Sequence, residues 1–346
     1  MAKNPKIEFY RINLSPLGEN ENITFKDVLI KKELLERQET NANNEPIPDN
    51  QIMPYLLSAF IRDIDGVAIR NESKKKAFYA ENTGENRVNR TISPIFERCI
   101  IHGRIKGGNF DTGKFLDEID TPGNNTESLG VTKLLSDDFY FLLYTPLNKK
   151  RGILILQTYT QDSIADIFRP FVENVFKVKE ITNKATSSLF MPEEMQNQFK
   201  EQSIIKKFEY KNQYIVPAIQ EEGLAESEFT INVTIASHGN QINLTNLPAW
   251  KRVLGRALFN FPNVDEREIE TFNRKRGYIK GGFDKSNPTK FSLDEDNFEI
   301  KATIYLDNFI QLEENGTPNW EELHAFALRI LTDDVIPEIY PEDDLI

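Results

Sequence analysis

FYFLLYTPLNKKRGILILQ, residues 139–157, holds two continuously apolar segments on either side of a polar, glycine-ended turn. Apolar runs of this length, rich in branched and aromatic side chains, are typical of strands that are covered on both faces. We therefore predict a β-hairpin over 139–157 that lies in the middle of a sheet.

Regular elements are expected on both sides of this hairpin. The stretch 6–14 reads as a strand, and Thr24-x-x-Asp27 resembles the start of a helix. A second helix is expected over 52–61, with Pro54 in its first turn. The segment 164–176 has apolar residues at helical spacing, and Asn319 precedes a last helix with a similar stripe.

The second half of the chain shows strict alternation of apolar and polar residues over 229–235 and 298–306. This period of two predicts strands with one covered face. We predict an α+β protein of two modules, each a mostly antiparallel sheet with helices packed on one face. The expected domains are 1–180 and 214–346, joined by a charged helical linker over 181–213.

Two short segments resemble each other across this boundary. Ile105-Lys106-Gly107-Gly108 and Ile279-Lys280-Gly281-Gly282 are each followed by a Lys-Phe pair. They suggest a diverged duplication, in which each strand ends in a Gly-Gly turn. Coincidence is the alternative, because Gly-Gly turns are common.

The composition limits the class of protein. The chain has 346 residues and a net charge of −12, with no apolar run long enough to span a bilayer and no leader-like N-terminus. We expect a cytoplasmic protein that does not contact membranes. The single cysteine, Cys99, excludes an internal disulfide, and the three histidines are too scattered in sequence for a zinc site. No resident cofactor is expected.

One pattern suggests an enzyme. Asp284 precedes Glu299-Ile300-Lys301, which resembles the arrangement Asp…Glu-x-Lys of magnesium-dependent nucleases of the PD-(D/E)xK type. There the carboxylates hold Mg²⁺ and the lysine assists the attacking water. The simpler alternative is a wet strand face with paired charges, since Glu209-Tyr210-Lys211 matches the same triplet.

Basic residues suggest nucleic acid, DNA or RNA, as a partner. Lys and Arg bind phosphates, and neighbouring aromatic side chains can stack on unpaired bases. The alternative is a set of solvated loops. The candidate residues gather in a stretch from 70 to 106 and in two further turns: Arg70, Lys74, Lys75, Lys76, Arg87, Arg90, Arg104, Lys106, Lys149, Lys150, Arg151, Arg274, Lys275 and Arg276.

A third hypothesis is a non-enzymatic protein that binds a protein partner or forms a homo-oligomer. The acidic segment 111–138 and the acidic C-terminal end would then face a basic partner. The amino-acid usage, rich in Lys, Asn, Ile and Phe, suggests a bacterial source. A role in a phage-defence or mobile-element system is expected on general grounds and not from particular residues.

Overall fold

The structure is a computed structural model, and its contacts divide the chain into two compact units. Unit 1 comprises Met1–Phe190 and Tyr305–Ile346, and unit 2 comprises Met191–Ile304. In the part that the structure describes, no helix is long and apolar enough to cross a membrane. The described residues are 4–16, 23–39, 46–81, 91–116, 127–128, 130, 132–178, 182–216, 226–236, 242–243, 274–281, 284–292 and 304–341.

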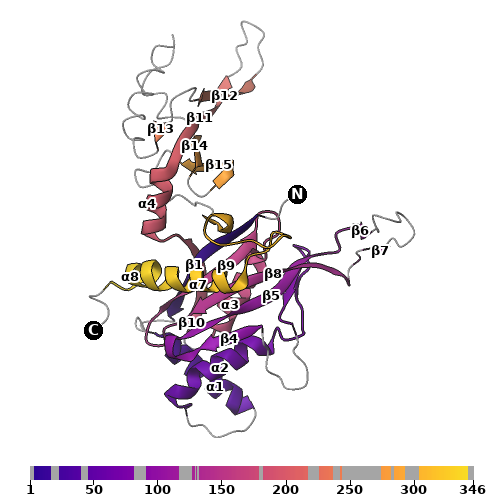
Figure 1. Cartoon of the computed structure of the whole chain (residues 1–346), viewed down its shortest axis with the longest axis vertical. Coiled ribbons are helices and arrows are strands. Elements are labelled where there is room, and N and C mark those ends of the chain that lie inside the picture. Colours follow the sequence, from indigo (N-terminus) through magenta and orange to yellow (C-terminus); the bar gives the residue numbers. More distant parts are fainter. Residues whose placement is uncertain are drawn as a thin grey trace. The chain divides into compact units, whose positions relative to one another are not determined.

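Unit 1 is built on a large antiparallel sheet (Figure 1). Among the described residues it has nine strands, in the order β10-β1-β9-β8-β5-β3-β2, with β16 paired to β1 and β4 paired to β5. The strands are β1 (Pro5–Pro16), β2 (Ile69–Asn71), β3 (Lys76–Tyr79), β4 (Ile92–Ile95), β5 (Ile100–Phe110), β8 (Leu134–Tyr144), β9 (Arg151–Tyr159), β10 (Thr182–Phe190) and β16 (Ile304–Tyr305). A separate ribbon pairs β6 (Phe115–Leu116) with β7 (Glu127–Ser128).

The predicted hairpin is confirmed as β8 and β9, which pair with each other in the middle of the sheet. Phe141, Leu143 and Leu154 point to one face, and Leu142 and Ile155 point to the other. All five side chains are fully buried. Both faces of the hairpin are therefore covered, as its uninterrupted apolar sequence requires.

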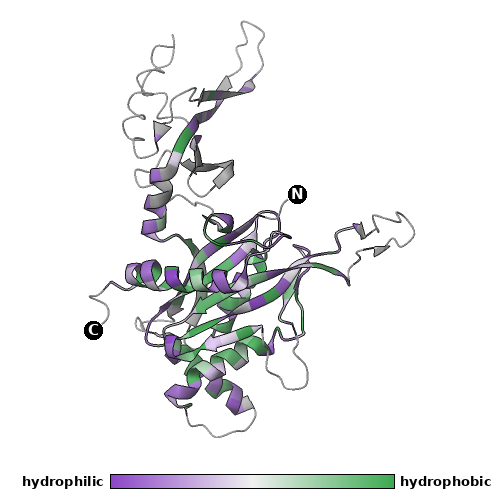
Figure 2. Cartoon of the chain, in the orientation of Figure 1, coloured by the Kyte–Doolittle hydropathy of each residue, from purple (hydrophilic) through white to green (hydrophobic). Residues whose placement is uncertain are grey.

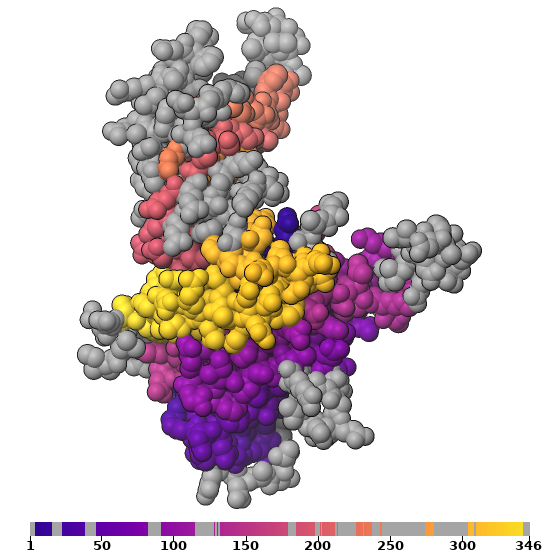
Figure 3. Space-filling model, in the orientation of Figure 1, coloured from indigo at the N-terminus to yellow at the C-terminus, as the bar shows by residue number. Residues whose placement is uncertain are grey.

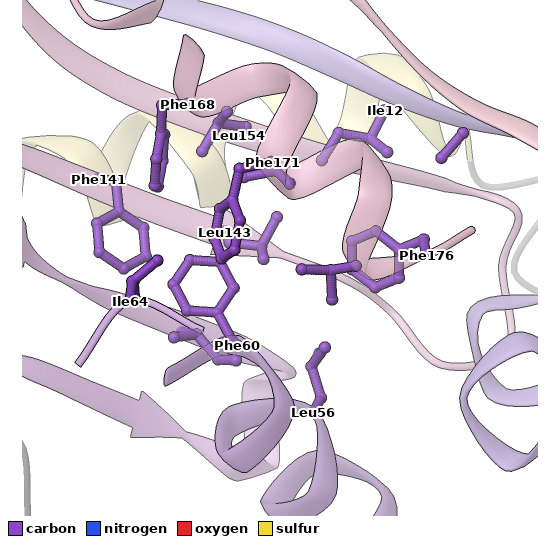
Figure 4. Packing of buried hydrophobic residues seen from close by; sticks show 14 of the residues in the cluster. Ile12, Leu56, Phe60, Ile64, Phe141, Leu143, Leu154, Phe168, Phe171 and Phe176 are labelled. Carbon is purple, nitrogen blue, oxygen red and sulfur yellow. The ribbon is translucent and has the colours of Figure 1, made fainter. Parts of the chain in front are cut away.

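One face of the sheet packs against three helices, α1 (Phe25–Glu39), α2 (Asp49–Arg62) and α3 (Ala165–Val175). Phe60 of α2 stacks on Phe141 at 5.3 Å between ring centroids (Figure 4). Phe168 and Phe171 of α3 contact the Phe60 ring edge-on. In unit 1 the hydrophobic colour is concentrated in the strands of the sheet and in α2 (Figure 2). This aromatic cluster is the main core.

The opposite face packs against the C-terminal segment, which lies over the strands of unit 1 (Figure 3). It contains the 3₁₀-helix η4 (Leu306–Asn308), α7 (Trp320–Ile330), the π-helix η5 (Leu331–Val335) and α8 (Ile336–Ile339). Leu323, Ala327 and Leu331 are fully buried there. Helices thus cover both faces of this sheet, whereas the sequence pattern predicted helices on one face only.

Two helix starts have the caps that the sequence predicted. The hydroxyl of Thr24 accepts a hydrogen bond from the backbone N–H of Asp27 at 3.3 Å, while the Asp27 carboxylate accepts from the Thr24 N–H at 2.9 Å. The Asn319 side chain accepts from the backbone N–H groups of Glu321 and Glu322, both at 3.1 Å. These bonds satisfy donors that a helix start leaves without partners.

The glycines of the first Ile-Lys-Gly-Gly segment do not form the expected turn. Gly107 and Gly108 lie inside β5, which continues to Phe110. A Cβ atom on Gly108 would lie 2.0 Å from the backbone oxygen of Leu135 on the neighbouring strand. These glycines therefore allow close strand approach. In the second segment Gly281 ends β14, and Gly282 lies outside the described residues.

Unit 2 contains an antiparallel sheet in the order β12-β11-β14-β15, with β13 paired to β11. Its elements are α4 (Glu193–Gln202), β11 (Ser203–Val216), β12 (Ser227–Ala236), β13 (Ile242–Asn243), β14 (Arg274–Gly281) and β15 (Asp284–Ser292). The region 181–213, predicted to be a helical linker, contains β10, α4 and most of β11. The residues from Tyr305 onward group with unit 1, whereas the sequence predicted one C-terminal domain over 214–346.

Candidate nucleic-acid interface

The sheet of unit 2 has two chemically different faces along β11 and β14. Phe208 and Tyr210 of β11 and Ile279 of β14 are buried. The residues that alternate with these along β11 and β14 point to the other face and carry polar groups. In the register of the two strands, Lys207 pairs with Tyr278, Glu209 with Arg276, and Lys211 with Arg274. Directly opposed residues share a face of the sheet, so these six side chains lie together.

We call this group of side chains the basic face; it comprises Lys207, Lys211, Arg274 and Arg276, together with the Tyr278 and Glu209 that lie among them. Its four cations surround a single carboxylate. Lys211 and Arg274 are exposed, and Arg276 is half-buried. The face is therefore strongly positive, although the whole chain is acidic.

The centre of the basic face is organised by hydrogen bonds. The Lys207 ammonium lies 4.2 Å from the centroid of the Tyr278 ring and 2.5 Å from the Glu209 carboxylate. The Tyr278 hydroxyl donates to the same carboxylate. This hydrogen bond raises the pKa of Tyr278, and the hydrogen bond to Glu209 raises the pKa of Lys207. Glu209 thus holds Lys207 and Tyr278 in fixed positions, while Lys211 and Arg274 lie outside this network.

Of the predicted triplet 274–276, Arg274 and Arg276 belong to the basic face. Lys275 pairs with Tyr210, so it lies on the opposite side of the sheet. Sequence reasoning missed Lys207 and Lys211 as part of this group. The alternation Lys207-x-Glu209-x-Lys211 was the signal that could have placed them on one face of a strand.

Most predicted lysines of unit 1 are paired with acids. Lys74 and Lys76 lie 3.4 and 3.1 Å from carboxylate oxygens of Asp166 in α3. Lys75 lies 2.9 Å from Asp111, and Lys106 lies 3.4 Å from Glu81. These acids neutralise much of the stretch that the sequence made basic.

The other predicted cations of unit 1 lie beside aromatic rings or in the hairpin turn. The guanidinium of Arg70 is 6.0 Å from the centroid of Phe110, and that of Arg104 is 5.3 Å from the centroid of Trp320. Lys149 is 5.3 Å from the Tyr340 ring. Next to it, Lys150 and Arg151 are exposed.

Several predicted site residues lie where the structure does not describe them. Arg87 and Arg90 fall in 82–90, and Glu299 and Lys301 fall in 293–303. Asp284 is the first residue of β15, where its backbone pairs with Gly281. The nuclease prediction therefore stays a prediction.

Two histidines that are far apart in sequence meet in unit 1. The rings of His102 in β5 and His324 in α7 stack at 4.0 Å between centroids, and the Tyr140 hydroxyl lies 2.8 Å from His324 Nδ1. Burial, with a smaller contribution from His324, lowers the pKa of His102 to about 4, and burial also lowers the pKa of His324. Both rings are thus neutral near pH 7. No cluster of three metal-ligating side chains occurs within the described residues.

Comparison with protein-family models and with curated proteins finds no match to this chain. The geometry of its own residues therefore carries the functional argument.

Proposed function

We propose that this protein binds nucleic acid through the basic face of unit 2. The observation that carries the proposal is the direct opposition of Lys211 and Arg274 in the β11–β14 register. Like charges at directly opposed positions destabilise a sheet. A bound phosphate between them turns this repulsion into two favourable contacts, because Arg and Lys both donate hydrogen bonds to phosphate oxygens.

The neighbouring residues fit the same ligand. Arg276 adds a guanidinium one pair further along the strands, and Lys207 adds an ammonium beyond it. Arg274 and Arg276 lie two residues apart on β14, about 6.6 Å along the strand, so the cations form a row to which successive phosphates can bind. The alternation of cations along β11 and β14 therefore favours a nucleic-acid backbone that runs along the strands.

Binding of labelled oligonucleotides over a series of salt concentrations tests this proposal. Single-stranded DNA, duplex DNA and RNA of equal length identify the preferred form. We expect affinity that falls steeply with salt and a weaker, flatter response in Lys211→Glu. Lys177→Glu, an equal charge change at an exposed residue of unit 1, is the matched control. Equal losses in both variants would refute the basic face as the binding site.

The magnesium-dependent nuclease is retained as a second proposal. It is favoured by the place of Asp284, which begins the strand next to β14 and its cations. Cleavage of a bound strand that requires Mg²⁺ and is lost in Glu299→Ala would support it. Unchanged cleavage in that variant would remove Glu299 from the assignment.

A shared origin of the two units is a separate proposal. It is supported by the presence of Ile105-Lys106-Gly107 and Ile279-Lys280-Gly281 on antiparallel strands of different sheets.

A further inference from the structure

The strand β12 forms one edge of the unit 2 sheet. Its ten residues pair with β11 without a break in register, from Ser227 opposite Val216 to Ala236 opposite Lys207. Among the described residues, no strand pairs with the other side of β12. The side chain of Phe229 is 54% exposed on this edge.

Edges of this kind are normally protected against pairing with other chains, by short length, charge or proline. Of the other described edge strands, β2 and β15 follow that rule, whereas the nine-residue β10 has one charge, Lys184, and no proline. In unit 1, β2 has three residues and includes Arg70, while in unit 2 the sequence of β15 includes Lys285, Pro288 and Lys290. In contrast, β12 reads Ser-Glu-Phe-Thr-Ile-Asn-Val-Thr-Ile-Ala, with one charge and no proline or glycine.

We propose that β12 pairs antiparallel with β12 of a second copy of this chain, in a register that places Asn232 opposite Asn232. This register opposes Thr230 to Thr234 and Phe229 to Ile235. Apolar residues then meet apolar residues, and the Asn232 amides, each both donor and acceptor, meet at the two-fold axis. The single charge, Glu228, lies opposite Ala236, so no like charges are opposed.

The proposed dimer does not depend on nucleic-acid binding, but it changes how the basic face is arranged. Opposed residues of an antiparallel pair point to the same side of the sheet. The two copies therefore join their sheets with both basic faces on one side. The four cations of each copy become one surface of eight, related by a two-fold axis.

A pair of charge variants tests the interface in the full chain. Thr230 and Thr234 are both exposed. In Thr230→Lys with Thr234→Lys, like charges oppose each other across the proposed interface. In Thr230→Lys with Thr234→Glu, opposite charges oppose each other at the same positions. Sedimentation velocity over a concentration series should show a dimer for the wild type and the Lys/Glu variant, and a monomer for the Lys/Lys variant.

The register is tested by cysteine cross-linking. Asn232→Cys places two thiols opposite each other, within the ~4.4–6.8 Å Cα separation of a disulfide. Thr230→Cys is the control, because its two copies lie four residues apart, or about 13 Å along the strands. Both variants keep Cys99, so its contribution is equal. We expect a cross-linked dimer of Asn232→Cys only. A wild type that stays monomeric, a dimeric Lys/Lys variant, or equal cross-linking of both cysteine variants would overturn the proposal.

Discussion

Lys211 of β11 and Arg274 of β14 occupy directly opposed positions of an antiparallel register, and both side chains are exposed. Within the described residues neither takes part in an ion pair. The lysines of unit 1 are different, because Lys74, Lys75 and Lys76 each have a carboxylate within 3.4 Å. Lys74, Lys75 and Lys76 are therefore neutralised within the fold, whereas Lys211 and Arg274 can bind an anionic ligand.

The histidine stack makes unit 1 sensitive to acid. The pKa of His102 is about 4 in the folded protein, against about 6.5 for an unperturbed histidine. The unfolded chain therefore takes up protons first as the pH falls. Stability from this stack is fully present above about pH 6.5 and is lost as the pH falls from there to about 4.

Urea unfolding over this pH range measures the effect. Replacing His102 by Gln removes the titrating ring, so the variant should lose less stability than the wild type between those two pH values. Carboxylates titrate in both proteins, so the difference between them isolates the histidine. Parallel pH profiles would contradict the assignment.

Close strand approach at Gly108 predicts a large effect of a single methyl group. In Gly108→Ala the new carbon meets the backbone oxygen of Leu135, which cannot move without breaking the β5–β8 pairing. We expect a loss of about 1–3 kcal/mol in the free energy of unfolding. Gly130→Ala is the control, because a Cβ atom there has nothing within 4 Å. Comparable losses in the two variants, measured by denaturant unfolding, would disprove the packing argument.

The cap at Asn319 predicts a smaller effect on the C-terminal segment. Asn319→Ala removes the acceptor for two backbone N–H groups at the start of α7 and should cost about 1 kcal/mol. Asn319→Asp keeps an acceptor oxygen, so it should retain nearly full stability. Thermal unfolding of the three proteins checks the order, and an Asp variant as unstable as the Ala variant would speak against a capping role.

Sequence patterns predicted the elements whose signals are local. The apolar runs of 139–157, the stripe of α3 and the caps at Thr24 and Asn319 depend on residues that are close in sequence, and all are confirmed. The pattern shows that both faces of the hairpin are buried, but it does not show what covers them. The contact of Tyr140 with His324 joins residues 184 positions apart, so no local signal announces it.

The candidate site was likewise predictable only where its residues are close in sequence. The basic stretch of 70–106 looked unpaired in sequence because Asp166 lies 90 positions from Lys76. Lys211 and Arg274 lie far apart in sequence on different strands, and only the register of β11 with β14 brings them together. The charges were therefore visible in the sequence, whereas their neutralisation and their grouping depend on tertiary structure.

The central claim is that the basic face of unit 2 binds nucleic acid, and two double variants test it most directly. Lys211→Gln with Arg274→Gln and Lys74→Gln with Lys75→Gln each remove two positive charges from the chain. The measurement is the slope of the logarithm of the binding constant against the logarithm of salt concentration. This slope is negative, and each lost phosphate contact reduces its magnitude by about 0.7 for a single strand or about 0.9 for a duplex. We predict that the magnitude of the slope falls by nearly the amount expected for two phosphate contacts in the first variant, and that it is almost unchanged in the second. Equal slopes in the two variants, or a larger loss in the second, would contradict the account.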